Sequence, residues 1–207
     1  MGMVQGLRSR YSEWSAVRMT NSGPQVVLIR HGETAWSRDR RHTGRTDIPL
    51  TSEGEAQAGA LTHRLDGRAF VNVLVSPSSR AVATAELAGL SGVEVAPDLL
   101  EWDYGDYEGR TTAAIRKDQP GWDLFADGVP HGESLGQVAE RVDRVIARIR
   151  SGSGDVVCVA HAHLLRVLAV RWVGTVPEAA RYLVLGPASI SELGWEREQP
   201  VIECWNT

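Results

Sequence analysis

The stretch QVVLIRHGET, residues 25–34, decides the fold. Its first six residues are a short run rich in β-branched side chains, which predicts a strand over residues 25–30. The strand ends in Arg30-His31-Gly32 rather than in a plain turn. Glycine lets the backbone approach a ligand closely, and a guanidinium offers two parallel donors to a phosphate. The segment is therefore equipped to meet a phosphate, although a structural, hydrogen-bonding histidine is the commoner explanation of such a segment taken alone.

Strand-like and helix-like segments alternate along the rest of the chain. Ser52 and Glu55 are spaced as a capping box at the start of one helix, and Gly174 is placed to stop another. A hairpin at the edge of the sheet is predicted from residues 190–195 and 201–205. The predicted helices cover residues 51–65, 78–90, 133–149 and 164–173. The other predicted strands cover residues 72–75 and 155–160.

This alternation predicts an α/β fold of three layers, with a doubly wound, mostly parallel sheet and helices on both faces. Residues 25–207 are predicted to form this single domain. Residues 1–24 are polar and aperiodic, which predicts a flexible N-terminal arm. Met19 stands just before the first strand, so a translation start at Met19 rather than Met1 is a hypothesis.

Polar residues follow three of the predicted strands. They are Arg30-His31, the segment from Ser76 to Arg80, and His161-Ala162-His163. Parallel sheets bind ligands at the carboxyl ends of their strands, so this coincidence locates a site. An arginine near a helix start can reinforce a phosphate pocket, although it is more often a solvated surface residue. The two histidines, taken alone, are also compatible with a helix N-cap region or with part of a zinc site.

Composition limits the classes of function. The 207 residues carry a formal net charge of −4, which argues against a general nucleic-acid binder. No run approaches the about 20 apolar residues that span a bilayer, and the N-terminus lacks the apolar core of a secretory signal. Two cysteines imply no disulfide framework, so a cytoplasmic protein is expected. The sequence does not reveal the oligomeric state and is compatible with a homodimer.

Residues 101–109, EWDYGDYEG, place four acids among three aromatic residues. Aromatic surroundings exclude water, which suits a glutamate for general acid work near neutral pH. The alternative is an aromatic-rich loop that covers the core and points its acids outward. The spacing alone favours neither reading.

Taken together, these motifs resemble the histidine phosphatase superfamily, also called phosphoglycerate mutase-like. Five matching segments in the family's order are highly specific, and they extend over about residues 25–172. The segments are LIRHGETAW, TGRTDIPLT, SPSSRAVATAEL, EWDYGDYEG and VAHAH. EWDYGDYEGRTTAAIR and WDLFADGVPHGES are similar in particular to the branch containing sedoheptulose-1,7-bisphosphatase and related bacterial acid phosphatases.

The resemblance implies a role for each matching position. His31 matches the nucleophile that becomes phosphorylated, and Glu101 matches the proton donor to the leaving oxygen. Arg30, Arg80 and a protonated His161 match the cluster that holds the phosphoryl group. The remaining matches are expected to line the phosphate or the adjoining substrate pocket: Ser37, Thr43, Gly44 and Ala162.

Beyond the phosphate, the sequence is less informative. His163 is given a supporting or substrate-side role at most. The residues expected to decide the substrate are Trp102, Tyr104, Trp122 and the loop over residues 123–133, although each aromatic residue is equally explained by core packing.

The resemblance implies a phosphatase of small phosphomonoesters, with sugar phosphates or bisphosphates as the expected substrates. Three positive groups in one pocket would offset the phosphoryl charge, so no metal or other cofactor is expected. The partner is then a small phosphorylated metabolite, not a nucleic acid or a membrane.

Two alternatives remain. The first is a phosphoglycerate mutase, but the family's mutases resemble one another in a longer insertion before the second histidine and in Glu-Arg-His-Tyr-Gly, where this chain has EWDYG. The second is a non-catalytic phospholigand-binding member, which would be expected to lack the nucleophile or the acid. Both residues are present here.

Overall fold

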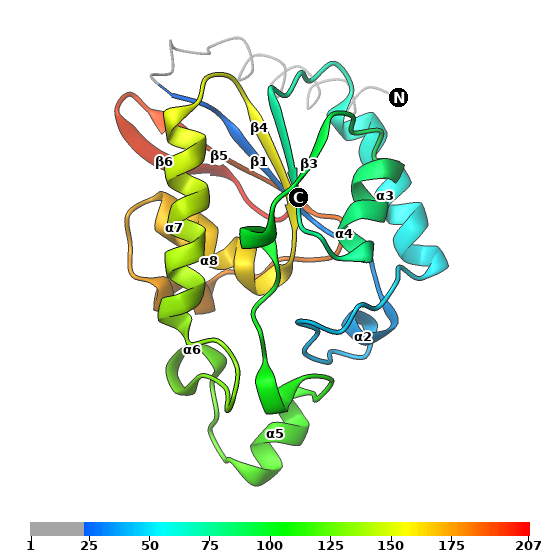
Figure 1. The fold of residues 1–207 in the computed structure, drawn as a ribbon, viewed down its shortest axis with the longest axis vertical. Helices are drawn as coiled ribbons and strands as arrows, with labels where there is room; N and C mark the ends of the chain where they lie inside the picture. The colour runs from blue at the N-terminus through cyan, green and yellow to red at the C-terminus, as the bar shows by residue number, and fades with distance from the viewer. Residues whose placement is uncertain (1–22) are drawn as a thin grey trace, which may run out of the picture.

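Four parallel strands form one side of a six-stranded sheet, and an antiparallel hairpin forms the other (Figure 1). The computed structural model describes residues 23–207, so the expected N-terminal arm, Met19 included, lies outside the described residues except for its last two. The sheet order is β3-β2-β4-β1-β5-β6. The strand bounds are β1 (Val26–Arg30), β2 (Asn72–Val75), β3 (Val93–Val95), β4 (Val156–Ala160), β5 (Ile190–Glu196) and β6 (Gln199–Cys204).

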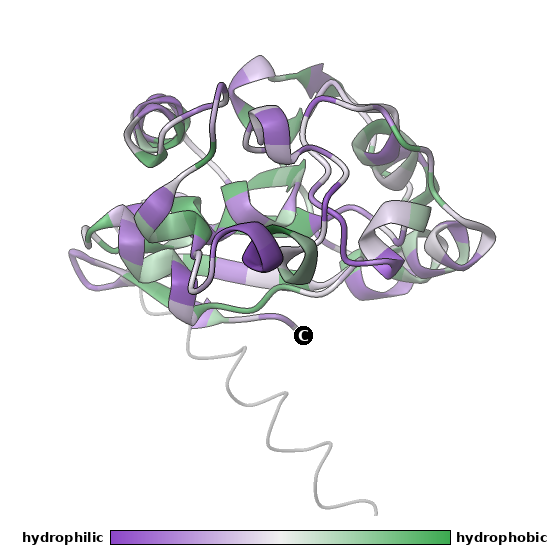
Figure 2. Cartoon of the chain, turned by 90° about the horizontal axis from the view of Figure 1, so that it is seen from below, coloured by the Kyte–Doolittle hydropathy of each residue, from purple (hydrophilic) through white to green (hydrophobic). Residues whose placement is uncertain are grey.

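Helices cover both faces of this sheet, which confirms the predicted three-layer α/β architecture. Alternate residues of β1 point to opposite faces: Val27 and Ile29 join the core under α3 and α4, whereas Val26 and Leu28 join the core under α7 and α8. The helices in Figure 2 carry both hydrophilic and hydrophobic residues, as expected of helices with one buried face. Their bounds are α3 (Ser52–Leu65), α4 (Ser79–Leu87), α7 (Leu135–Ser151) and α8 (Ala162–Trp172).

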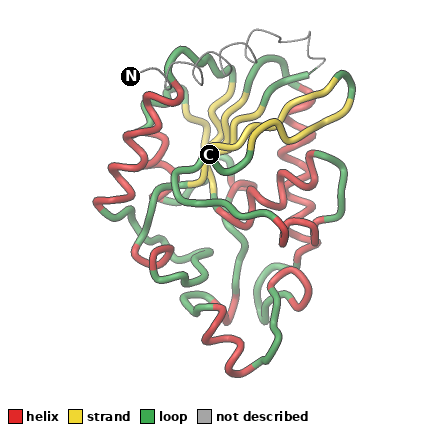
Figure 3. The backbone as a smooth tube through the Cα atoms, turned by 180° about the vertical axis from the view of Figure 1, so that it is seen from behind, coloured by secondary structure: helices red, strands yellow, loops and turns green. Residues whose placement is uncertain are grey.

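Several short elements have no counterpart among the predictions. They lack the apolar periodicity of a long element, and β3 is a three-residue, exposed edge strand. Figures 1 and 3 show that α2, α5 and α6 lie together at one end of the molecule, beyond the sheet. The short elements are α2 (Ala35–Arg38), α5 (Thr112–Asp118), α6 (Leu124–Asp127) and the 3-10 turns η1 (Pro97–Leu99), η2 (Gly105–Tyr107) and η3 (Pro177–Tyr182).

One prediction about a helix start is wrong. Thr51, not Ser52, caps α3, and its hydroxyl accepts from the backbone N–H of Gly54. Contacts outside the helix select this residue, because the Thr51 N–H and hydroxyl donate to the backbone and the side chain of Glu33. Gly174 ends α8 as predicted, with a positive φ of 77°.

The sheet register brings the polar strand ends together. Arg30 pairs with Ala160 across β1 and β4, so His31 and His161 follow side by side. Val75 pairs with Val159 across β2 and β4, which places Ser76 beside the same strand end. The three predicted polar segments therefore meet at one edge of the sheet, as expected for parallel strands.

None of the helices formed by residues 23–207 combines the length and the hydrophobicity that spanning a bilayer requires.

Candidate active site

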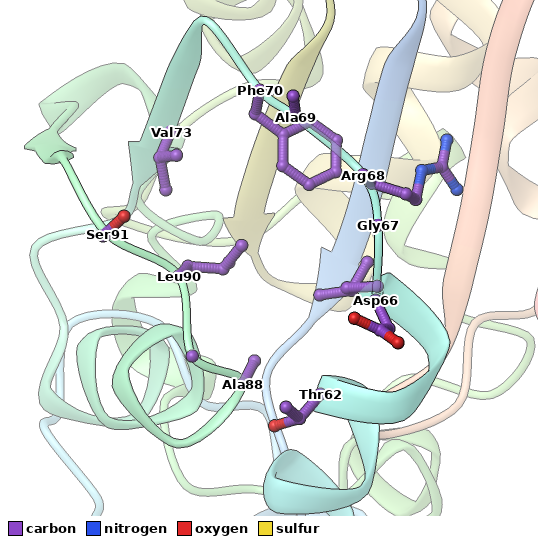
Figure 4. Close-up of a pocket in the computed structure, with 12 residues that line it drawn as sticks. Thr62, Asp66, Gly67, Arg68, Ala69, Phe70, Val73, Ala88, Leu90 and Ser91 are labelled. Atoms are coloured by element: carbon purple, nitrogen blue, oxygen red, sulfur yellow. The ribbon is translucent and has the colours of Figure 1, made fainter.

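Two sizeable cavities lie at opposite ends of the sheet. The first, of about 390 Å³, is formed by the ends of α3 and α4 and the segment that leads into β2 (Figure 4). Its one arginine, Arg68, is ion-paired with Glu192 at 2.8 Å, and its one acid, Asp66, is exposed. The second, of about 490 Å³, lies at the carboxyl ends of the strands and contains the predicted site residues Arg30, His31 and Glu101. The second cavity is therefore the candidate active site.

Not every predicted site residue borders this cavity. The predicted residues that line it are Arg30, His31, Ser37, Thr43, Glu101 and Ala162. Arg80 and His161 lie behind the cavity wall and have no exposed surface. They are still next to His31, because the His31 and His161 rings are 5.1 Å apart and the Arg80 charge acts on both imidazoles.

The structure fixes the tautomer of His31. Its Nδ1 lies 2.7 Å from the carbonyl oxygen of Gly32. A carbonyl can only accept, so Nδ1 carries the proton and the Nε2 lone pair is free. Burial, and then the charges of Arg30 and Arg80, hold the pKa of His31 well below its ordinary value. His31 is therefore a neutral imidazole at neutral pH.

Two guanidinium groups stand beside this imidazole. Arg30 ends β1 and donates from Nη1 to the carbonyl of Leu185 at 2.5 Å. Arg80, in the first turn of α4, donates to three backbone carbonyls of the loop over residues 43–46. Burial is the main cause that lowers the pKa of each arginine from its ordinary value. A guanidinium group is not deprotonated in proteins, so both remain cations near neutral pH.

His161 is the N-cap residue of α8 and makes no side-chain cap bond. Its Nε2 lies 2.7 Å from Ser76 Oγ, and its Nδ1 has no partner. Burial, followed by the charges of Arg80, His31 and Arg30, holds the pKa of His161 well below its ordinary value. With only protein groups around it, His161 is thus neutral, whereas the resemblance implies a protonated ring. An anion beside the ring would favour the protonated form.

Three nitrogen atoms without a partner belong to residues around His31. Within residues 23–207, four buried side-chain polar atoms lack a hydrogen-bond partner. Three of them are Arg30 Nε, Arg80 Nε and His161 Nδ1, and the fourth is Arg181 Nε. Buried polar atoms are rarely left unpaired, so a cluster of three suits a site that binds an acceptor-rich group.

Glu101 is buried and caps α8 from a distant part of the chain. Its carboxylate accepts from the backbone N–H groups of His163 (3.1 Å), Leu164 (2.9 Å) and Trp102 (2.9 Å). The carboxyl group thus takes the place that the His161 side chain leaves free at the helix N-terminus. Both readings of the acid motif hold in part, because Glu101 faces the cavity while Asp106 points outward.

The predicted pocket residues contribute mainly through local structure. The Ser37 hydroxyl forms a capping box with Thr34 in α2, and the Thr43 hydroxyl donates to the Arg41 carbonyl. Gly44 presents its backbone to Arg80 behind the cavity. Ala162 lines the cavity in the first turn of α8, a favourable place for an anion.

Aromatic side chains form part of the cavity wall. The Tyr104 hydroxyl lies 2.6 Å from Nδ1 of His163, and His42 packs on the Tyr104 ring at 4.8 Å. Burial is the largest cause of two opposite shifts. It raises the pKa of Tyr104 well above its ordinary value and lowers the pKa of His163 well below its ordinary value. Trp102, expected to help choose the substrate, is instead fully buried in the core, whereas Trp122 packs against His42 at 5.5 Å.

Sequence reasoning missed part of the cavity lining. Arg166 could have been found, because it follows His163 by three residues and so shares its helix face. The hydrophobic segment Leu183–Leu185 gave no signal, since it follows η3 without a motif. The missed lining residues are Arg40, Arg41, His42, Thr112, Arg166, Arg181, Leu183, Val184 and Leu185.

The zinc alternative for His161 and His163 finds no further ligand. Over residues 23–207, no group of three or more histidine, cysteine or acidic side chains is placed to hold a metal ion.

Chemically, the arrangement combines a free imidazole lone pair, two buried cations and a buried carboxyl group. A neutral imidazole is a competent nucleophile, and fixed cations stabilise negative charge that develops on a phosphoryl group. The site is therefore suited to attack on phosphorus.

Comparisons with known proteins agree with this geometry. The family model described as histidine phosphatase superfamily (branch 1) matches residues 26–207. An acid phosphatase from Mycobacterium tuberculosis is 43% identical over 178 residues, which cover 83% of this chain and 87% of that protein. A sedoheptulose 1,7-bisphosphatase from Saccharomyces cerevisiae is 34% identical over 192 residues, which cover 75% of this chain and 70% of that protein.

A probable phosphoglycerate mutase GpmB from Salmonella arizonae is 33% identical over 193 residues, covering 87% of this chain and 89% of that protein. Among solved structures, that of an open reading frame from Mycobacterium tuberculosis superposes with a TM-score of 0.84 at 39% identity, covering 88% of this chain and 97% of that one. The chain belongs to the histidine phosphatase superfamily, as the resemblance of its motifs predicted.

The buried histidines make stability depend on pH, and His42 gives the clearest case. Burial lowers the pKa of His42 from 6.5 to about 4. In the unfolded chain the ring takes a proton near pH 6.5. The contribution of the neutral His42 ring to the free energy of unfolding is therefore complete above that pH and is lost as the pH falls to about 4. His42→Gln should therefore flatten the pH dependence of the unfolding free energy in this window, by about 3 kcal/mol in total.

Urea unfolding at several pH values between 4 and 7.5 measures the effect. His63→Gln, at an exposed position of α3, is the matched control and should keep the wild-type dependence, because that ring faces water in both states. A His42→Gln curve parallel to the wild-type curve would contradict the assignment.

Proposed function

We propose that this member of the histidine phosphatase superfamily hydrolyses small phosphomonoesters through a phosphohistidine on His31. The observation that carries the proposal is the hydrogen bond from His31 Nδ1 to the Gly32 carbonyl, because it leaves Nε2 free as the attacking atom. The buried Arg30 and Arg80 beside that imidazole favour the approach of an anionic phosphoryl group.

The phosphoryl oxygens bind where the protein leaves donors without partners. In this proposal they accept from Arg30, Arg80 and His161 Nδ1, and from the N-terminus of α8 at Ala162. The phosphoryl charge raises the proton affinity of His161, so that the ring becomes a cation only when the substrate is bound. These groups offset the charge that magnesium offsets in other phosphoryl-transfer sites.

The reaction consists of two displacements at phosphorus. In the first, His31 Nε2 forms a bond to phosphorus as the ester P–O bond breaks, and Glu101 gives its proton to the departing alkoxide. In the second, water attacks the phosphohistidine, Glu101 takes a proton from that water, and the N–P bond breaks to release phosphate. Glu101 ends protonated and His31 neutral, so the cycle closes.

Phosphate release and phosphoenzyme trapping test the proposal directly. The wild-type protein should release phosphate from p-nitrophenyl phosphate and from sugar phosphates in the presence of EDTA, and quenching in alkaline detergent should trap a phosphoprotein that acid then hydrolyses. His31→Ala should abolish both signals together, because both depend on Nε2. His63→Ala, at an exposed histidine of α3 outside the cavity, is the control and should keep both.

Phosphate release that persists in His31→Ala would remove the phosphohistidine from the mechanism. The same panel contains 3-phosphoglycerate, since one relative is named a probable phosphoglycerate mutase. Isomerisation of that substrate without phosphate release would identify a mutase instead.

The role of Glu101 is tested by leaving-group dependence. Glu101→Gln removes the proton but keeps one carbonyl oxygen, which can still accept from the Leu164 N–H at the start of α8. The rate on a sugar phosphate should fall by roughly 100- to 10,000-fold, because an alkoxide needs a proton to leave. p-Nitrophenolate leaves without one, so the loss on p-nitrophenyl phosphate should be much smaller. Equal losses on both substrates would exclude Glu101 as the general acid.

A further arginine in the cavity lining, Arg166, supports substrates with a second anionic group. Arg166 lines both the main cavity and an adjoining one of about 160 Å³ beside Phe125. Its Nε donates to the Ala180 carbonyl, and its guanidinium stacks on the Phe125 ring at 4.9 Å. It forms no ion pair with any residue from 23 to 207. This fixed cation favours a sugar bisphosphate over a monophosphate.

Arg166→Met tests this preference, because it removes the charge and keeps an apolar side chain against Phe125. The kcat/KM for fructose 1,6-bisphosphate should fall about 10- to 100-fold, the value of a charge-assisted hydrogen bond, while that for p-nitrophenyl phosphate should change less than about 3-fold. Arg144→Met, at an exposed residue paired with Asp98, is the control. Equal losses on both substrates would show that Arg166 acts on the phosphate site and not on a second anion.

A further inference from the structure

The loop over residues 43–46 lies between a buried cation and a carboxylate. Its carbonyl groups face Arg80, which donates to Thr43 O at 3.3 Å, Gly44 O at 3.2 Å and Thr46 O at 3.1 Å. Its N–H groups face Glu108, whose Oε1 accepts from Gly44 at 2.9 Å and from Thr46 at 3.2 Å. Glu108 Oε2 also lies 3.0 Å from Gly44 N. One side chain thus holds the loop that holds Arg80.

The link passes through a single peptide group. The peptide between Thr43 and Gly44 gives its carbonyl to Arg80 and its N–H to Glu108. A trans peptide directs these two groups to opposite sides, so the carboxylate and the guanidinium lie on either side of one planar unit. The peptide dipole then has its positive end toward the carboxylate and its negative end toward the guanidinium, which is favourable at both ends.

Glu108 is itself held firmly. Two backbone hydrogen bonds, Gly109 N to His42 O at 2.8 Å and His42 N to Arg110 O at 2.9 Å, fasten its segment beside the loop. Gly44 packs closely against Trp102 and Glu108, because a Cβ on Gly44 would lie 2.4 Å from the Trp102 carbonyl oxygen and 2.8 Å from Glu108 Oε2. The contact between Glu108 and the loop therefore leaves little room for movement.

The other groups around Arg80 cannot replace Glu108. Asp47 lies 3.8 Å from Arg80 Nη1, but its side chain is 55% exposed and accepts mainly from the start of α4 at Ser79. Glu101 and Tyr104 act on the Arg80 charge, and neither bonds to the loop.

We propose that Glu108 is a positioning residue for Arg80: through the backbone of residues 43–46 it fixes the guanidinium that receives the phosphoryl group. The inference rests on the proposed function, since it gives Arg80 a phosphate to bind. Placing the carboxylate one peptide away keeps the guanidinium fixed without a contact ion pair to Glu108 that would compete with the substrate phosphate.

A matched pair of variants tests the proposal. Glu108→Met keeps the length of the side chain and removes both acceptors, whereas Glu108→Gln retains an Oε1 that accepts from Gly44 and Thr46. Binding of inorganic phosphate, measured by isothermal titration, reads the position of Arg80 without any need for turnover. Glu108→Met should weaken phosphate binding and lower kcat/KM for p-nitrophenyl phosphate by roughly 10-fold or more, and Glu108→Gln should restore most of both. Glu94→Gln, at an exposed glutamate of β3, is the control.

A double-mutant cycle separates positioning from general structure. In an Arg80→Ala background, Glu108→Met should cause no further loss of phosphate affinity, because the group that it positions is gone. A full additional loss there, or a Glu108→Gln variant as weak as Glu108→Met, would overturn the proposal. If Glu108→Met does not fold by circular dichroism, Glu108→Ala replaces it, since the half-buried position lets water reach the loop.

Failure of this inference is distinguishable from failure of the proposed function. A protein that binds phosphate but has no phosphatase activity still reports on Glu108 through its affinity. If the protein is an active phosphatase and its affinity for phosphate does not change in the Glu108 variants, only the positioning role is refuted.

Discussion

The burial of two guanidinium groups beside His31 is the constraint on which the rest of the site depends. A buried charge is costly unless it is hydrogen-bonded. Backbone carbonyls meet this need for both arginines, one from Leu185 for Arg30 and three from residues 43–46 for Arg80. The remaining donor capacity of each guanidinium, including its Nε, stays available. Carbonyl dipoles thus hold the cations in place and leave their charge for a ligand.

The same charges determine the state of the histidines. Burial and the nearby arginines hold the pKa of His31 and of His161 well below the ordinary value, so neither ring carries a proton that would block its lone pair at neutral pH. In the proposed mechanism, the features that attract an anion therefore also keep His31 reactive. Binding and reactivity have one physical origin here, and the sheet register, which sets His31 beside His161, makes it possible.

The sequence predicted those parts of the fold and the site that depend on local pattern. Central strands such as β4 are uninterrupted apolar runs, and α7 has a one-sided apolar stripe, so both were found with small errors at their ends. The cap of α3 was misplaced by one residue, because Thr51 and Ser52 are equally able to cap and only contact with Glu33 decides between them. The short helices and β3 were missed, since tertiary contacts hold them and no periodicity marks them.

The site shows the same division. The motif-bearing residues His31, Arg30 and Glu101 meet as expected, because strand ends and a helix N-terminus place them. Arg80 and His161 also lie beside His31, but they lie behind the cavity wall, and only the packed structure reveals this. The Leu183–Leu185 wall depends on a return of the chain after η3 that no local pattern encodes.

In the proposed function, phosphate binding and substrate choice rest on different segments of the chain. The arginine-holding loops are tied to distant residues, residues 43–46 by Glu108 and the loop at Leu185 by Asn206, which accepts from Gly186 at 2.6 Å. The wall that would face the substrate belongs to α5, α6, η3 and the first turns of α8, which lie outside the strands of the sheet. These segments can change without disturbing the register that places His31. A family built in this way can keep one reaction while varying its substrates, which explains why the motifs indicate the chemistry of this protein more sharply than its substrate.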